Sequence, residues 1–277
     1  MNLRTGAASL LAAIVMLVGL AVSLPGMKGS AATLAENTSG PPSAPDTSST
    51  PVLVELFTSE GCSDCPPAEA LLRRLGRTQP VHGADVIVLE EHVDYWDRLG
   101  WKDPFSSEAA TARQGDYGEA FGGAQVYTPQ MIVDGHAQFV GSSESAALRA
   151  IRTAVGTPKP GIHLTWTDAG KLAIQIEPLT NATRSDPPQV YLAVTENMLH
   201  SDVKRGENAG RALEHDGVVR QLTAVGKADT ASTGFSSTIA VPTAREWNRT
   251  NLRVVVFVQE RRSGRILAVS AVPFSAA

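Results

Sequence analysis

The chain has 277 residues, a formal net charge of -4 and two cysteines. Charged residues of both signs are interspersed along it, so it has no basic stripe of the kind that nucleic-acid binding requires, and nucleic acid is excluded as a partner. Both cysteines lie in one short motif, so no network of disulfides staples the fold together.

The N-terminus has the pattern of a secretory signal peptide. Arg4 precedes an apolar run over residues 7–24, and the small residues 29–32 follow it. We expect residues 1–32 to form the signal peptide, cleaved before Thr33. The alternative is an uncleaved anchor, because the apolar run approaches the roughly 18 to 20 residues that span a bilayer. Either way the bulk of the chain is expected to be exported, to the periplasm or outside the cell.

Residues 33–50 are rich in Ser, Thr, Pro and Gly, which predicts a disordered tether. The segment 51–156 then has the pattern of an α/β domain. Its expected elements are a strand over 52–57, a helix over 68–75, a strand over 85–89, a helix over 106–117, a hairpin of strands around 130–133 and 138–141 turning at Asp134-Gly135, and a helix over 143–155.

A Pro/Gly-rich linker at 157–161 is predicted to separate this domain from a smaller, all-β one at 162–277. The second part contains seven short β-like runs and no strong helical pattern, which favours a β-sandwich. These runs are 162–167, 172–176, 190–196, 218–225, 235–241, 252–260 and 266–272.

The chemistry is expected at Cys62-Ser63-Asp64-Cys65, between the first strand and the first helix. This spacing lets the two sulfurs close a small disulfide, and a helix N-terminus favours a thiolate. We assign Cys62 as the exposed nucleophile and Cys65 as the resolving cysteine. Asp64 lies between them, and its negative charge is expected to disfavour the thiolate and make the pair more reducing.

Two alternatives compete with a redox role for this pair. A structural zinc site needs four ligands, and the chain has no second Cys pair and no pair of histidines at finger spacing, so we assign no metal ligands. A purely structural disulfide makes the same bond without exchanging it.

A strand ending in Glu90-Glu91-His92-Val93-Asp94 is expected to bring polar groups near the cysteines. His92 and Asp94, with Asp64, are candidates for a proton shuttle or for groups that support the cysteines. His92 and Asp94 would also complete a Cu(I) site with the two thiolates. The alternative is a loop with solvated charges. The segment 204–215 is likewise either a substrate-facing loop or a solvated connection.

Thr128-Pro129, just before an apolar strand, resembles the cis-proline element of the thioredoxin superfamily, in order and separation from the CxxC. The resemblance implies a cis bond at Pro129 and a Thr128 backbone that pairs with an incoming peptide. The blocks 54–68, 92–97, 100–105, 127–130 and 205–215 resemble the exported bacterial family called domain of unknown function 1223. This resemblance implies a thioredoxin-like fold with an appended domain, but no substrate.

From these features we expect an exported thiol–disulfide oxidoreductase that acts on protein thiols or disulfides. Its only redox group would be the Cys62–Cys65 disulfide, with no other cofactor. The alternatives are a thiolate copper-binding protein and a non-catalytic binding module on a thioredoxin scaffold.

Overall fold

The computed structural model describes residues 49–229 and 233–275, which all belong to one compact unit. The expected signal peptide and nearly all of the expected tether lie outside the described residues. Within the described ranges, no helix has both the length and the apolar character needed to cross a membrane.

The first half of the unit follows the expected order of strands and helices. Its elements are β1 (Thr50–Thr58), α1 (Pro66–Thr78), β2 (Ala84–His92), the 3-10 helix η1 (Asp97–Leu99), α2 (Glu108–Ala120), β3 (Gln130–Val133), β4 (Ala137–Val140) and α3 (Glu144–Val155). β1 runs parallel to β2 and antiparallel to β3, and β3 pairs antiparallel with β4. The sheet order over this half is therefore β2-β1-β3-β4.

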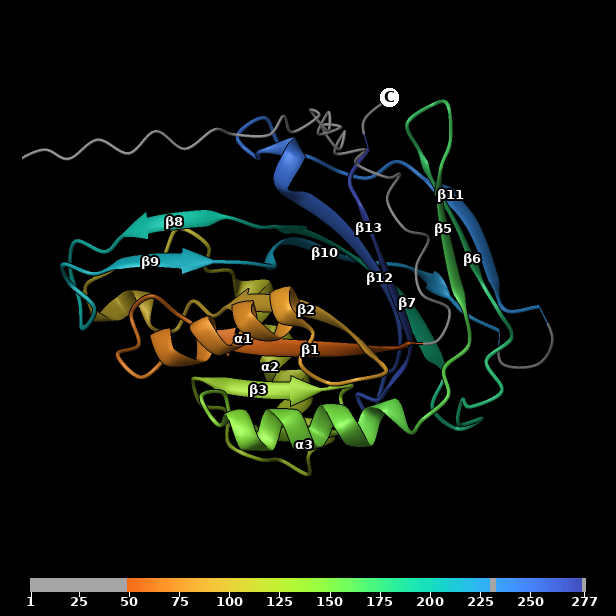
Figure 1. The fold of residues 1–277 in the computed structure, drawn as a ribbon, viewed down its shortest axis with the longest axis horizontal. Coiled ribbons are helices and arrows are strands. Elements are labelled where there is room, and N and C mark those ends of the chain that lie inside the picture. The colour runs from red at the N-terminus through yellow and green to blue at the C-terminus, as the bar shows by residue number, and fades with distance from the viewer. Residues whose placement is uncertain (1–48, 230–232, 276–277) are drawn as a thin grey trace, which may run out of the picture. The chain divides into compact units, whose positions relative to one another are not determined.

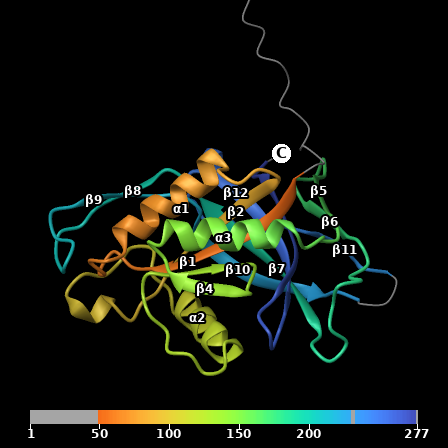
Figure 2. The ribbon, with the colours of Figure 1, turned by 60° about the horizontal axis from the view of Figure 1, so that its bottom comes forward.

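Successive side chains of β1 point to opposite faces of the sheet. Val52, Val54 and Leu56 pack with α1 and α3, whereas Phe57 packs with Tyr117 of α2 on the other face. Figures 1 and 2 show the same division, with α1 and α3 on one side of the strands and α2 on the other. The end of β1 and the start of α1 are thus both fixed by buried contacts.

The second half contains all seven expected strands and one unexpected hairpin. Its elements are β5 (Ile162–Trp166), β6 (Leu172–Ile176), β7 (Pro188–Glu196), β8 (Leu199–Asp202), β9 (Ala212–His215), β10 (Val218–Lys227), β11 (Phe235–Ile239), the 3-10 helix η2 (Arg249–Asn251), β12 (Leu252–Glu260) and β13 (Ile266–Pro273). The β8–β9 hairpin was not predicted, because both of its strands are only four residues long.

The structure does not confirm a separate all-β domain after residue 161. Four of the later strands extend the first sheet into one eight-stranded sheet of order β13-β12-β7-β10-β2-β1-β3-β4. The join is between β10 and β2, where Val218 pairs with Glu90. β5, β6 and β11 form a second layer, seen at the right of Figures 1 and 2, which packs on the sheet through a shared apolar core, and β8 pairs with β9 in a separate two-stranded sheet. The fold is a mostly-β mixed sheet with few helices.

Candidate functional site

The Cys62–Cys65 pair lies in the turn that joins β1 to α1. The two residues form a disulfide, with 2.18 Å between the sulfurs and 5.4 Å between the Cα atoms. Cys65 is the N-cap of α1, and Pro66 occupies the first helical position, where its missing N–H costs no hydrogen bond. The expected placement of the motif, between strand and helix, is confirmed.

The expected exposure of Cys62 is wrong, because a loop from the second half of the chain covers it. Cys62 is only 1 % exposed and Cys65 is fully buried. The loop 203–211 joins β8 to β9, and Asn208 within it donates from Nδ2 to the carbonyl oxygens of Glu60, at 2.9 Å, and Cys62, at 2.8 Å. Glu207 accepts a hydrogen bond from the Ser63 N–H. Most of this loop is exposed, as expected of a solvated connection, but Glu207 and Asn208 bond it to the disulfide turn, and we call it the 203–211 cover.

The peptide bond between Thr128 and Pro129 is cis, as expected. Trp96 connects this bond to the disulfide turn. Its indole Nε1 donates to Thr128 Oγ1 at 2.8 Å, and its Cβ lies 3.2 Å from the position that a Cβ on Gly61 would occupy. A larger side chain at position 61 would meet Trp96, which gives a steric reason for glycine before Cys62.

A buried polar cluster lies at the carboxyl end of β2, behind the disulfide turn. His92 contacts Asp103 through Nδ1 at 2.7 Å and Glu90 through Nε2 at 3.3 Å. His215 of β9 contacts Glu90 through Nδ1 at 2.7 Å and Glu60 through Nε2 at 3.4 Å. All five side chains are almost completely buried.

The carboxylates of this cluster raise the pKa values of both histidines. Burial acts to lower the pKa of His215, but Glu90 and Glu60 together outweigh it and raise that pKa to about 10. Burial likewise acts to lower the pKa of His92, but Asp103 and Glu90 raise it well above its usual value. Burial raises the pKa of Glu69, on α1, to about 7. The cluster therefore favours positive charge at the two imidazoles.

The structure does not bring the three expected supporting residues together. His92 lies in the polar cluster, whereas Asp94 accepts a hydrogen bond from Thr111 Oγ1 of α2 at 2.6 Å. Asp64 is exposed beside the cysteines. Strand alternation explains part of this separation, because β2 points Glu90 and His92 to the face that α1 covers, and the strand ends at His92.

Three members of the site, Glu60, Asp103 and His215, were not assigned a role from the sequence, and Asn208 was considered only as a residue that could order a substrate-facing loop. Each of them lies inside one of the sequence blocks that carry the family resemblance, which is the signal that marks them. Asp103 holds the cluster in place, because it also accepts hydrogen bonds from the backbone N–H groups of Glu60 and Phe105.

A second buried ion pair lies on the opposite face of the sheet. Arg113 of α2 contacts Glu55 of β1, and it also donates to Gln259 of β12 at 3.0 Å. Tyr117 donates a short hydrogen bond to Glu55. Because these residues join α2 to two strands in separate halves of the chain, we interpret this network as structural.

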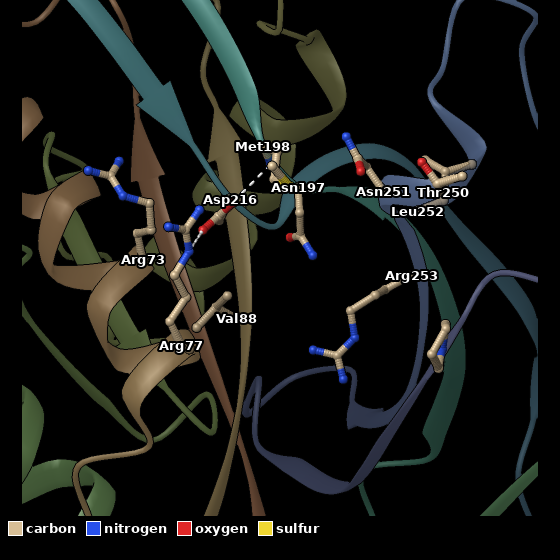
Figure 3. Close-up of a pocket in the computed structure, with 12 residues that line it drawn as sticks. Arg73, Arg77, Val88, Asn197, Met198, Asp216, Thr250, Asn251, Leu252 and Arg253 are labelled. Atoms are coloured by element: carbon tan, nitrogen blue, oxygen red, sulfur yellow. Dashed lines mark hydrogen bonds and ion pairs between the residues drawn. The ribbon is translucent and has the colours of Figure 1, made fainter. Parts of the chain in front are cut away.

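A cavity of about 500 Å³ lies beside the polar cluster, beyond the turn from β9 to β10. Figure 3 shows Arg73, Arg77 and Arg253 around it, with Arg77 bonded to Asp216. Arg73 forms an ion pair with Glu214. No cysteine lines this cavity, so it is distinct from the disulfide site.

Comparison with known proteins gives a family and a fold. A search of curated proteins found no match. The crystal structure of protein AGR_C_4864 from Agrobacterium tumefaciens is 27% identical, with a TM-score of 0.64, over 82% of this chain and 95% of that one. HBP35 of Porphyromonas gingivalis is 13% identical, with a TM-score of 0.57, over 82% of this chain and 76% of that one, a likeness of fold alone. The family model described as "Protein of unknown function (DUF1223)" matches residues 53–259, and the chain belongs to that family.

Proposed function

We propose that the chain is an exported thiol–disulfide oxidoreductase whose working group is the Cys62–Cys65 pair on a thioredoxin-like scaffold. One observation carries the proposal. The disulfide closes the turn between β1 and α1, and the cis Thr128-Pro129 bond leads into the neighbouring strand β3, with Trp96 bonded to Thr128 and lying beside Gly61 of the turn.

The arrangement around the pair supports the scaffold part of the proposal. The order β2-β1-β3-β4, with β1 and β2 parallel and β3 reversed, places the CxxC turn and the cis-proline side by side on neighbouring strands. A CxxC next to a βαβ unit is the pattern of a thioredoxin-like redox motif. The second half of the chain adds strands beyond β2 and supplies the 203–211 cover. Export rests on the sequence of residues 1–32.

The chemistry is a two-step exchange that moves two electrons. In the oxidising direction, a substrate thiolate attacks Cys62 Sγ, a mixed disulfide forms and the Cys65 thiolate leaves. The second substrate thiolate then attacks the substrate sulfur of the mixed disulfide, and Cys62 leaves as a thiolate. The reducing direction runs through the same intermediate, with the Cys62 thiolate attacking a substrate disulfide and Cys65 resolving it.

Either direction requires the 203–211 cover to move. A substrate sulfur must approach Cys62 Sγ in line with the bond that breaks, and the structure buries that atom. We infer that the closed state protects the disulfide and that exchange takes place from a state in which Asn208 has released the carbonyl oxygens of Glu60 and Cys62.

Trapping of the mixed disulfide tests the function. Cys65→Ser removes the resolving thiol, so incubation of this variant with a peptide disulfide should accumulate a covalent adduct at Cys62, detected by mass spectrometry. Cys62→Ser is the matched control and should accumulate much less adduct. Failure of Cys65→Ser to form an adduct, while its reduced thiol reacts with a small alkylating reagent, would contradict exchange chemistry.

Burial of both cysteines favours one alternative, a non-catalytic binding module in which the disulfide only holds the turn. Under that alternative the Cys62→Ser, Cys65→Ser double variant keeps its partner binding. In the parent chain, the disulfide then resists the reductants that reduce a disulfide exchanger.

A further inference from the structure

Two histidines and two glutamates converge in the buried polar cluster. Glu90 and His92 come from the end of β2, His215 comes from the end of β9, and Glu60 precedes the disulfide turn. Glu90, His92 and His215 each offer a ligand atom, and these atoms lie within 4.8 Å of one another. The four residues are at most 2 % exposed. The sequence does not reveal this convergence, because His215 and Glu90 are 125 residues apart.

Three polar atoms in this group have no hydrogen-bond partner among the residues that the structure describes. They are His92 Nε2, His215 Nε2 and Glu60 Oε1, and each is inaccessible to solvent. His92 Nε2 lies 3.3 Å from Glu90 Oε1, and His215 Nε2 lies 3.4 Å from Glu60 Oε1, in both cases without hydrogen-bond geometry. Buried polar atoms are otherwise nearly always satisfied, so three together call for a ligand.

The spacing of these atoms fits a small cation. Zinc binds imidazole nitrogen and carboxylate oxygen at about 2.0 to 2.2 Å, so neighbouring ligand atoms around a tetrahedral ion are separated by roughly 3.3 Å. The 3.3 Å between His92 Nε2 and Glu90 Oε1 has this separation, and His215 Nδ1 lies 2.7 Å from the same Glu90 oxygen. The rings of His92 and His215 are edge to face, with 5.0 Å between their centroids.

The outer contacts of His92 are those of a metal-binding histidine. Its Nδ1 is 2.7 Å from Asp103 Oδ2, which turns Nε2 toward the other donors. Asp103 is itself fixed by the backbone N–H groups of Glu60 and Phe105. A carboxylate bonded to the far nitrogen of a histidine fixes the ring orientation and raises the basicity of the ligating nitrogen.

Charge gives an independent reason for a cation. Four carboxyl groups are buried here: Glu60, Glu69, Glu90 and Asp103. Across residues 49–229 and 233–275, none of the four forms an ion pair with a lysine or an arginine, and their only basic partners are His92 and His215. Buried negative charge that no lysine or arginine offsets is costly, so a divalent ion among these carboxylates would balance it.

We propose that Glu90, His92 and His215 form a binding site for a divalent transition-metal ion of the zinc type, with Glu60 facing the far nitrogen of His215. Imidazole and carboxylate are suitable ligands for this ion. The site is distinct from the cysteine pair, and it does not depend on redox activity. Because Glu90 and His92 lie at the end of β2 and His215 ends the hairpin that carries the 203–211 cover, a bound ion would fasten that hairpin to β2.

Calorimetric titration of the full chain with Zn²⁺ tests the site. The Cys62→Ser, Cys65→Ser double variant serves as the background, so that no thiolate can bind the ion. We expect one Zn²⁺ per chain in this background, and we expect His215→Ala to weaken binding at least about 100-fold, since loss of a direct ligand should exceed the 10- to 100-fold effect of losing an outer contact. His163→Ala is the matched control, because His163 is exposed and pairs only with Glu177, and it should leave binding unchanged.

X-ray absorption at the zinc edge gives a second test that needs no histidine variant. The Zn²⁺-loaded full chain with both cysteines intact should show two imidazole rings bound at about 2.0 to 2.1 Å and no sulfur at about 2.3 Å. Absence of stoichiometric binding, sulfur at the bonding distance, or equal losses in His215→Ala and His163→Ala would each overturn the proposal. None of these outcomes bears on adduct formation by Cys65→Ser, so this proposal and the redox proposal fail separately.

Discussion

Asn208→Ala should open the 203–211 cover and expose the disulfide to reductants. The Asn208 amide donates two buried hydrogen bonds, to the carbonyl oxygens of Glu60 and Cys62. Each contributes about 0.5 to 1.5 kcal/mol, so the closed state should lose about 1 to 3 kcal/mol relative to the open one. If reduction proceeds from the open state, this loss raises its rate roughly 5- to 150-fold.

The assay is reduction of the Cys62–Cys65 disulfide by an excess of dithiothreitol under native conditions, with samples quenched by alkylation and counted by mass. Asn181→Ala is the matched control. Asn181 also donates from Nδ2 to a backbone carbonyl, that of Leu267 in β13, and neither residue belongs to the disulfide turn or the cover. If Asn208→Ala stays folded and its disulfide is reduced at the same rate as in the parent chain, Asn208 does not hold the cover closed.

Three further substitutions test separate parts of the account. Arg113→Met leaves Glu55 buried without its cation and should lower the free energy of unfolding by about 3 to 5 kcal/mol in urea denaturation, and a loss below about 1 kcal/mol would show that the pair is dispensable. Gly206→Ala places a side chain at a φ of 76°, with its Cβ 3.2 Å from that of Trp101, and should destabilise the chain by roughly 1 to 2 kcal/mol, whereas equal stability would contradict the assigned backbone conformation. Asp64→Asn removes a negative charge beside the thiolate and should raise the midpoint potential of the pair. An unchanged or lower potential would refute that reasoning.

Local patterns in the sequence predicted most of the elements but not how the two halves combine. The helical spacing of apolar residues located α1 and α3, and the Asp134-Gly135 turn located the β3–β4 hairpin. Each depends on residues near one another in the chain. The pairing of Val218 with Glu90 joins strands that are far apart in the sequence, and no periodicity records which strand pairs with which. The Pro/Gly-rich stretch at 157–161 therefore predicted a domain boundary where the structure has a connection between α3 and β5.

In the candidate site, too, the sequence revealed local motifs but not contacts between distant residues. The CxxC at a strand–helix junction and the proline before an apolar strand were identifiable because each is a short motif. The cover was not, because β8 and β9 are only four residues long and the contacts of Asn208 are with residues about 146 positions away in the sequence. Glu60 and His215 meet only in the fold, and Asp94 does not join them because β2 ends at His92.

The midpoint potential of the Cys62–Cys65 pair tests the central claim most directly. It is measured by alkylating the thiols of the full chain across a series of dithiol redox buffers. The account predicts a reversible two-electron transition between about -270 and -120 mV, the range of known exchangers. A potential below about -300 mV would identify an inert structural disulfide and contradict the proposed oxidoreductase function.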